Sequence, residues 1–156
     1  MTRLSIITAA AAFVTLGAVG ATAAPSGAMI VYKDPNCGCC GGWIDYVRAA
    51  GFEIEIRDTT SMHEVKVRLR VPDEVVSCHT AEIDGYVLEG HVPLPALEAV
   101  LQQRPKVRGL AVAGMPAGSP GMEAPGMAPE PYEVILFTDG ARQPLWTFLG
   151  SERQER

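Results

Sequence analysis

The stretch MIVYKDPNCGCCGGW, residues 29–43, joins a short apolar run to three cysteines that occupy three of four consecutive positions. The run at 29–32 predicts a buried strand, and residues 41–52 predict a helix that ends at Gly51. The cysteines therefore lie where a strand passes into the beginning of a helix. Ligand sites in open α/β sheets gather at the carboxyl ends of strands. This junction is the first candidate site.

Strands and helices alternate beyond this junction. Apolar residues alternate with charged ones at 52–58, which predicts a half-buried strand, and a helical pattern follows at 61–71. Two strands joined by a tight turn are expected within 79–92, and a third helix is expected at 93–104. The resulting order, β-α-β-α-β-β-α, is typical of a thioredoxin-like α/β domain.

The C-terminal part of the chain departs from this order. Residues 109–131 are rich in Met, Gly and Pro, which predicts a loop, and residues 131–149 predict a β-hairpin. The charged residues 151–156 are expected to be a disordered end. The expected domain organisation is therefore a signal peptide at 1–24, a thioredoxin-like metal-binding domain at 25–150, and a disordered C-terminal end at 151–156.

The leader has the three parts of a secretory signal peptide. Arg3 precedes an uncharged run, and small residues follow up to Ala24. We therefore expect cleavage and a periplasmic protein. No later segment is long and apolar enough to span a bilayer, so no membrane span is expected after cleavage.

The charge of the chain argues against nucleic acid as a partner. The formal net charge is −5, and the basic residues are scattered along the sequence. A nucleic-acid surface needs a clustered basic patch, commonly with aromatic residues for stacking. Neither feature is present in the sequence.

Export to an oxidising compartment favours disulfides, and the chain has four cysteines. A disulfide framework, however, spreads its cysteines to join distant segments. Here Cys37, Cys39 and Cys40 lie together and only Cys78 lies elsewhere, so at most one bridge could cross the fold. A purely structural role is disfavoured.

Two chemical roles remain for the cluster. Cys37 and Cys40 form a CxxC motif, which thioredoxin-like oxidoreductases place at the same strand–helix junction, so this pair could be catalytic in thiol–disulfide exchange. The loop expected to face the motif, however, carries Cys78 and His79. A fourth thiol and an imidazole beside three thiols favour a metal site. The helix N-terminus expected at the CxCC motif would also stabilise the thiolate form, which is the form that binds metal.

The donor types favour copper over zinc without excluding zinc. Structural zinc is usually held by two separated pairs of Cys or His ligands, whereas Cu(I) prefers thiolates and thioethers and tolerates shared sulfur. Met115, Met122 and Met127 lie among Gly and Pro with no periodic apolar face to fill. His91, between a predicted strand and a predicted helix, is a further candidate ligand.

Three blocks, VYKDPNCGCCGGW, SCHTAEIDGYVLEGHVP and GLAVAGMPAGSPGME, together resemble the family of exported metal-binding proteins that includes the copper-resistance protein CopG. The likeness runs from about Met29 to Leu149. It implies a thioredoxin-like fold whose CxCC motif and distal cysteine bind copper, with sulfurs that can bridge more than one Cu(I). The segment EAPGMAPEP, residues 123–131, is the least family-like, so Met127 is the weakest candidate ligand.

The resemblance also implies roles for individual residues. Thiolate ligands would be Cys37, Cys39, Cys40 and Cys78, with His79, His91 and Met115 as neighbours or further ligands. The implied role is periplasmic copper handling, by sequestration or by copper redox chemistry, with copper ions and other periplasmic copper-handling proteins as partners. A passive carrier and an oxidoreductase both need accessible soft sulfur, so the sequence leaves this choice open.

Overall fold

The computed structural model describes residues 27–155; the predicted signal peptide at 1–24 lies outside the described residues. The elements, in chain order, are β1 (Met29–Lys33), α1 (Gly38–Ala49), β2 (Ile54–Asp58), α2 (Met62–Leu69), the 3-10 turn η1 (Asp73–Val75), β3 (His79–Ile83), β4 (Tyr86–Glu89), α3 (Leu94–Gln103), β5 (Gly109–Ala111), β6 (Pro131–Phe137), β7 (Arg142–Leu149) and β8 (Glu152–Arg153).

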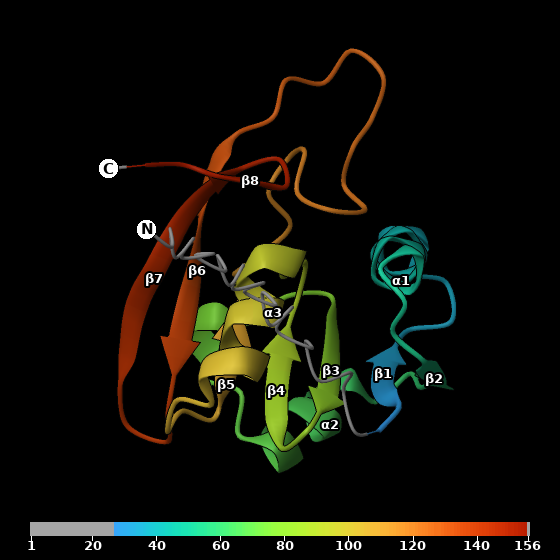
Figure 1. The fold of residues 1–156 in the computed structure, drawn as a ribbon. Helices are drawn as coiled ribbons and strands as arrows, with labels where there is room; N and C mark the ends of the chain where they lie inside the picture. Colours follow the sequence, from blue (N-terminus) through green and yellow to red (C-terminus); the bar gives the residue numbers. More distant parts are fainter. Residues whose placement is uncertain (1–26, 156) are drawn as a thin grey trace, which may run out of the picture.

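All strands belong to one mixed sheet with the order β2-β1-β3-β4-β5-β6-β7-β8 (Figure 1). β1 is parallel to β2 and antiparallel to β3, and β3 pairs with β4 as a hairpin. The elements from β1 to α3 follow the predicted order β-α-β-α-β-β-α, with η1 as an added turn. The α/β fold class is therefore confirmed, together with the C-terminal hairpin formed by β6 and β7.

The helices cover both faces of the sheet. Trp43 of α1 and Leu97 of α3 pack with Leu88 of β4 in one buried cluster, whereas Leu69 of α2 packs with Val87 of β4 in the other. Because successive residues of a strand point to opposite faces, β3 and β4 present different side chains to α1 and to α2. As a result, the buried His79 lies on one face of the sheet and the buried Thr80 and Glu89 lie on the other.

Two short strands differ from the sequence expectations. β5 lies in the segment expected to be a loop, and it joins β4 in parallel and β6 in antiparallel pairing. β8 lies within the end expected to be disordered; it pairs with β7, and Arg153 stacks over the Trp146 ring at 3.9 Å. Pairing with existing strands stabilises both segments, which have little strand pattern of their own.

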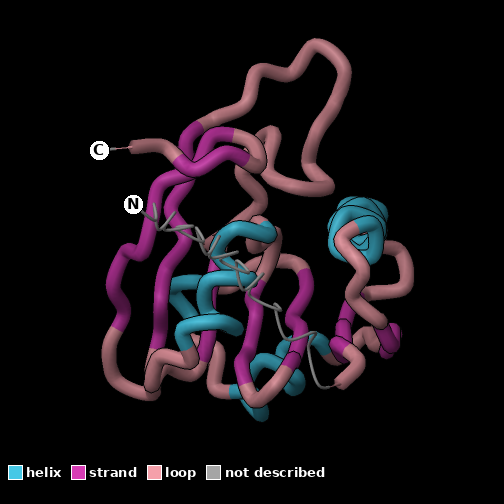
Figure 2. Tube along the Cα trace, viewed as in Figure 1, coloured by secondary structure: helices cyan, strands magenta, loops and turns pink. Residues whose placement is uncertain are grey.

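Residues 112–130 form the long loop between β5 and β6, which rises beyond the ends of the strands (Figure 2). This loop carries the Met-Gly-Pro motifs of the sequence. Within residues 27–155, no helix combines the length and apolar character needed to cross a bilayer.

Candidate metal centre

The four cysteines converge because the segment after β1 and the segment before β3 lie side by side, at the ends of two paired strands. Cys37 is the N-cap of α1, and Cys39 and Cys40 lie in its first turn. Cys78 comes directly before β3, whose first residue, His79, is opposite the last residue of β1. As a result the sulfur atoms of all four cysteines lie within 4.8 Å of one another.

The sulfurs are in two chemical states in this structure. Cys37 and Cys40 form a disulfide with a Cα–Cα distance of 5.4 Å, whereas Cys39 and Cys78 are free thiols. Cys39 Sγ lies 3.6 Å from Cys37 Sγ and 3.9 Å from Cys78 Sγ. The CxxC pair can therefore close into a disulfide at the same place where four thiolates would gather after reduction.

Two buried imidazoles flank the Cys78 sulfur. Cys78 Sγ lies 3.3 Å from His79 Nδ1 and 3.2 Å from His91 Nε2, and both histidines are fully buried. His91 Nδ1 lies 2.8 Å from the Pro120 carbonyl oxygen, which can only accept a hydrogen bond. His91 Nδ1 therefore carries the proton, and its Nε2 presents a lone pair toward Cys78. Metal-binding histidines are oriented in this way by a bond from the other ring nitrogen.

His79 has a buried ring nitrogen without a protein partner. Among the described residues, its Nε2 is buried and makes no hydrogen bond. Its ring packs against Trp43 at 4.6 Å and against His91 at 5.0 Å between centroids. Trp43 is itself fixed by a 2.9 Å bond from Nε1 to the Val92 carbonyl. The other ring nitrogen, Nδ1, faces Cys78 Sγ, and the ligand atoms of Cys78, His79 and His91 all lie within 4.8 Å of one another, so the donor set fits a metal ion.

Burial sets the protonation of the donors. It lowers the pKa of His79 well below the ordinary value, and the nearby His91 and Lys66 lower this pKa further. Burial also lowers the pKa of His91, partly offset by the bond to Pro120. The pKa of Cys78 is raised to about 12, first by burial and then by Cys39. At neutral pH both imidazoles are therefore uncharged, and an ion that bound Cys78 would have to displace a proton.

The long loop packs against the first turn of α1. A side-chain carbon at Gly121 would lie 2.9 Å from the Cys39 carbonyl oxygen, and one at Gly42 would lie 3.0 Å from Gly121 Cα. Only glycines permit this approach. Gly121 also has φ +85°, a left-handed conformation that side chains disfavour. The contact places the Pro120 carbonyl over His91.

Met115 is attached to the site through its chain neighbour. The Gly114 amide donates to the Val76 carbonyl at 3.0 Å, and the Ser77 hydroxyl donates to the Gly114 carbonyl. The Met115 side chain itself is 54% exposed, and in the described part of the chain its sulfur makes no hydrogen bond to the cysteines. The structure thus brings together every predicted ligand except Met115, which lies on a loop tied to the segment before Cys78.

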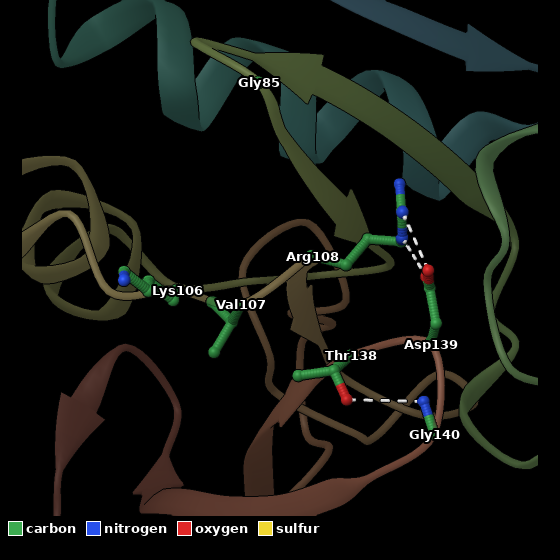
Figure 3. Close-up of a pocket in the computed structure, with 7 residues that line it drawn as sticks. All are labelled: Gly85, Lys106, Val107, Arg108, Thr138, Asp139 and Gly140. Carbon is green, nitrogen blue, oxygen red and sulfur yellow. Dashed lines mark hydrogen bonds and ion pairs between the residues drawn. The ribbon is translucent and has the colours of Figure 1, made fainter.

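A polar cleft of about 470 Å³ lies at the other end of the same strands (Figure 3). It is lined by Gly85 in the β3–β4 turn, by Lys106, and by an Arg108–Asp139 ion pair. Cys78 and His91 flank the opposite ends of β3 and β4. The cleft is therefore separate from the sulfur cluster.

The sequence did not reveal two groups that hold candidate ligands in place through hydrogen bonds. The Pro120 carbonyl fixes His91, and Glu89 accepts a 2.6 Å bond from the Ser77 amide beside Cys78. Pro120 lies inside the third block that resembles the copper-resistance family, which was the available signal. Glu89 looked like an ordinary polar residue at a strand end.

Comparison with solved structures shows which known proteins this chain is similar to. Two solved structures, of copper resistance protein CopG in its form 2 and form 1, are each 42% identical to the chain, with TM-scores of 0.73 and 0.72. The aligned part covers 78% of this chain and 97% and 96% of the two CopG chains. The chain belongs to the CopG family.

Other comparisons are narrower. Residues 75–122 match a family described as "Protein of unknown function, DUF411". The matched segment runs from η1 to the long loop and includes Cys78, His79, His91 and Met115. No curated protein sequence matches the chain. Family membership and the cysteine cluster together indicate copper-related metal binding.

Proposed function

We propose that this protein binds Cu(I) in the periplasm through Cys37, Cys39, Cys40 and Cys78, after the Cys37–Cys40 disulfide has been reduced. The observation that carries the proposal is the convergence of all four sulfurs within 4.8 Å at a helix N-terminus. Three of the sulfurs belong to the N-cap and first turn of α1, and a helix N-terminus is a favourable place for negative charge. Three of these cysteines, Cys37, Cys39 and Cys78, are half-buried, so an ion can reach their sulfurs from solvent.

The number and type of donors support copper and more than one ion. Four sulfurs and two imidazoles exceed the four ligands of a structural zinc site. Sulfur that is crowded to this degree suits Cu(I), which tolerates low coordination numbers and bridging thiolates. Cys78 is shared between the sulfur group and the Cys78–His79–His91 group, so it would bridge the two parts of the site.

The role proposed for the bound copper is resistance by sequestration, with transfer to other periplasmic copper-handling proteins or a change of copper oxidation state. The named relatives are copper resistance proteins. The proposed periplasmic location is supported by the leader at residues 1–24. In this role copper is the cargo of the protein and not a resident cofactor.

A second candidate function is thiol–disulfide exchange by Cys37 and Cys40. The disulfide between them favours it. An incoming thiolate would attack Cys37 Sγ, form a mixed disulfide, and release Cys40 as a thiolate near the N-terminus of α1. Attack at Cys37 is the accessible route, because Cys40 is fully buried whereas Cys37 is half-buried.

The test is a metal competition on the mature protein, purified without oxygen, reduced, and offered equal Cu(I) and Zn(II). Retention of more than one Cu(I) per chain, with fewer ions in Cys78→Ser, is the expected result. Retention of a single zinc would overturn copper specificity. Binding of neither metal, together with insulin reduction that survives Cys39→Ala, would favour the exchange function.

A further inference from the structure

A buried ionic network lies on the face of the sheet opposite the histidines. Glu89 and Thr80 are fully buried, and Lys66 is 8% exposed. Lys66 Nζ donates to Glu89 Oε1 at 2.5 Å and to Thr80 Oγ1 at 2.9 Å, while Thr80 Oγ1 donates to Glu89 Oε2 at 2.6 Å. These contacts join α2 to the paired residues Thr80 and Glu89 of β3 and β4.

The network reaches the metal centre through one backbone bond. The Ser77 amide donates to Glu89 Oε1 at 2.6 Å, and Ser77 directly precedes Cys78. On its other side, Ser77 is bonded through its hydroxyl to Gly114 of the long loop. The segment that carries Cys78 is thus held from the sheet by Glu89 and from the loop by Gly114.

Stability alone does not account for a buried Lys–Glu pair in this place. Removing two charges from water costs as much as their attraction returns, and apolar side chains of the same size would commonly serve as well. What apolar side chains could not supply is an acceptor for the Ser77 amide. Ser77 is half-buried, but its amide points at the fully buried Glu89 side chain. An N–H that faces the interior without an acceptor is costly, so the Ser77–Cys78 segment would have to move.

We infer that Glu89, paired with Lys66, is a positioning residue that fixes the backbone before Cys78 so that Cys78 Sγ remains between His91 and Cys39. The relevant distances from Cys78 Sγ are 3.2 Å to His91 Nε2 and 3.9 Å to Cys39 Sγ. The positioning itself is a property of the metal-free fold. Its consequence for copper rests on the function proposed above.

The experiment compares two double variants that both lack the ion pair. In Lys66→Met/Glu89→Gln, the amide oxygen can still accept from Ser77 and the amide nitrogen can donate to Thr80. In Lys66→Met/Glu89→Leu, the acceptor for Ser77 is gone. Each is made in the full mature chain, reduced and metal-free, and thermal unfolding checks that both fold.

The first readout is amide hydrogen exchange at Ser77 and Cys78, measured by NMR. We expect the Gln variant to keep the protection of the wild type and the Leu variant to lose it by about tenfold or more, since a bond to a charged or amide acceptor is removed. Equal exchange in the two variants would overturn the inference. If neither variant folds, exchange is measured on the wild type, with the Ala81 amide in β3 as the protected reference. Exchange of the Ser77 amide at the rate of an open loop would overturn the inference.

The second readout is the number of Cu(I) ions retained. The Leu variant should lose the same ions as Cys78→Ser, and the Gln variant should lose none. If both variants keep the full number of ions, Glu89 has no effect on the site and the inference fails. If the wild type itself binds no copper, the proposed function fails, whereas the exchange measurement still tests the positioning.

Discussion

Cys39 Sγ lies 3.9 Å from Cys78 Sγ, although 39 positions separate the two residues in the chain. One thiol belongs to the first turn of α1 and the other to the segment before β3. This contact joins the CxCC motif to the two histidines. An ion shared by these sulfurs would connect the sulfur-rich and nitrogen-rich parts of the centre, and the following predictions depend on that connection.

Copper capacity should depend on the redox state of Cys37 and Cys40. We expect the reduced protein to retain more than one Cu(I) and the disulfide form to retain at most one, because oxidation removes two of the four sulfur ligands. Anaerobic titration with a Cu(I) chelator measures both forms. The Cys37→Ser/Cys40→Ser variant is the control and should have the low capacity in either redox state. Equal capacity in the two states of the wild type would contradict a four-thiolate site.

His91→Ala should weaken Cu(I) binding by about tenfold to a hundredfold, in the range seen when groups around a metal are removed. The reason is the 3.2 Å approach of His91 Nε2 to Cys78 Sγ, with the ring fixed by Pro120. Competition against a chelator gives the affinity. His63→Ala is the matched control, since His63 is exposed on α2. An unchanged affinity in His91→Ala would remove the imidazole from the ligand set.

Comparing variants of Met115 and Met127 tests whether Met115 is a copper ligand or only an exposed methionine. Both side chains are equally exposed, at 54% and 53%, but only Met115 adjoins a residue bonded to Ser77. We expect Met115→Leu to lower Cu(I) affinity by about tenfold, about 1.4 kcal/mol, and Met127→Leu to leave it unchanged. X-ray absorption at the copper edge checks for the sulfur lost. Matching effects of the two variants would exclude a specific thioether.

Gly121→Ala should destabilise the protein more than Gly126→Ala. Both glycines have positive φ, +85° and +79°, so both variants carry the same backbone penalty, about 1 kcal/mol. At Gly126 an added carbon meets open space, whereas at Gly121 it would lie 2.9 Å from the Cys39 carbonyl. We expect an extra loss of about 2 kcal/mol from this overpacking. Urea unfolding measures the difference, and equal losses would show that the loop does not pack on α1 in solution.

Acid should destabilise the metal-free reduced protein through His79. Burial lowers the pKa of His79 in the folded state, so below the unfolded value of about 6.5 the unfolded chain binds more protons. This contribution to stability is complete above that pH and is lost as the pH falls, by about 1.4 kcal/mol per unit at most.

Urea unfolding between pH 7.5 and 5.5 tests this titration by comparing the wild type with His79→Phe. Glu89, with a pKa raised by burial, changes stability in the opposite direction in both proteins, so the difference between them isolates His79. Parallel pH profiles of the two proteins would contradict a buried neutral histidine.

Much of the central fold could be predicted because its elements carry their own patterns. The strand–cysteine–helix junction at residues 29–43 and the hairpin of β3 and β4 were recognisable from apolar spacing and turn residues. β5 was not, since Gly109–Ala111 has three residues and no alternation. Its strand conformation comes from pairing with β4 and β6, which are distant in sequence.

The candidate site divides in the same way. The approach of Cys78 to the CxCC motif follows from the connectivity, since the segment before the third strand reaches the end of the first. The buried position of Lys66 could not be predicted, because its neighbours in α2 include exposed residues such as Val67 and Arg68 and the helix resembles a surface helix. Only the packing of α2 on the sheet buries it.

The two apolar clusters that hold the described part of this fold together contain none of the cysteines, although Cys40 is itself buried. Both buried apolar clusters of the described residues consist of other side chains, drawn from helices on each face of an eight-stranded sheet. Small zinc domains, by contrast, unfold when the metal leaves. Emptying the centre would here cost only local contacts, so one molecule could be filled and emptied many times while its scaffold remains intact. For the copper function proposed here, the fold would therefore serve as a container that can be used repeatedly.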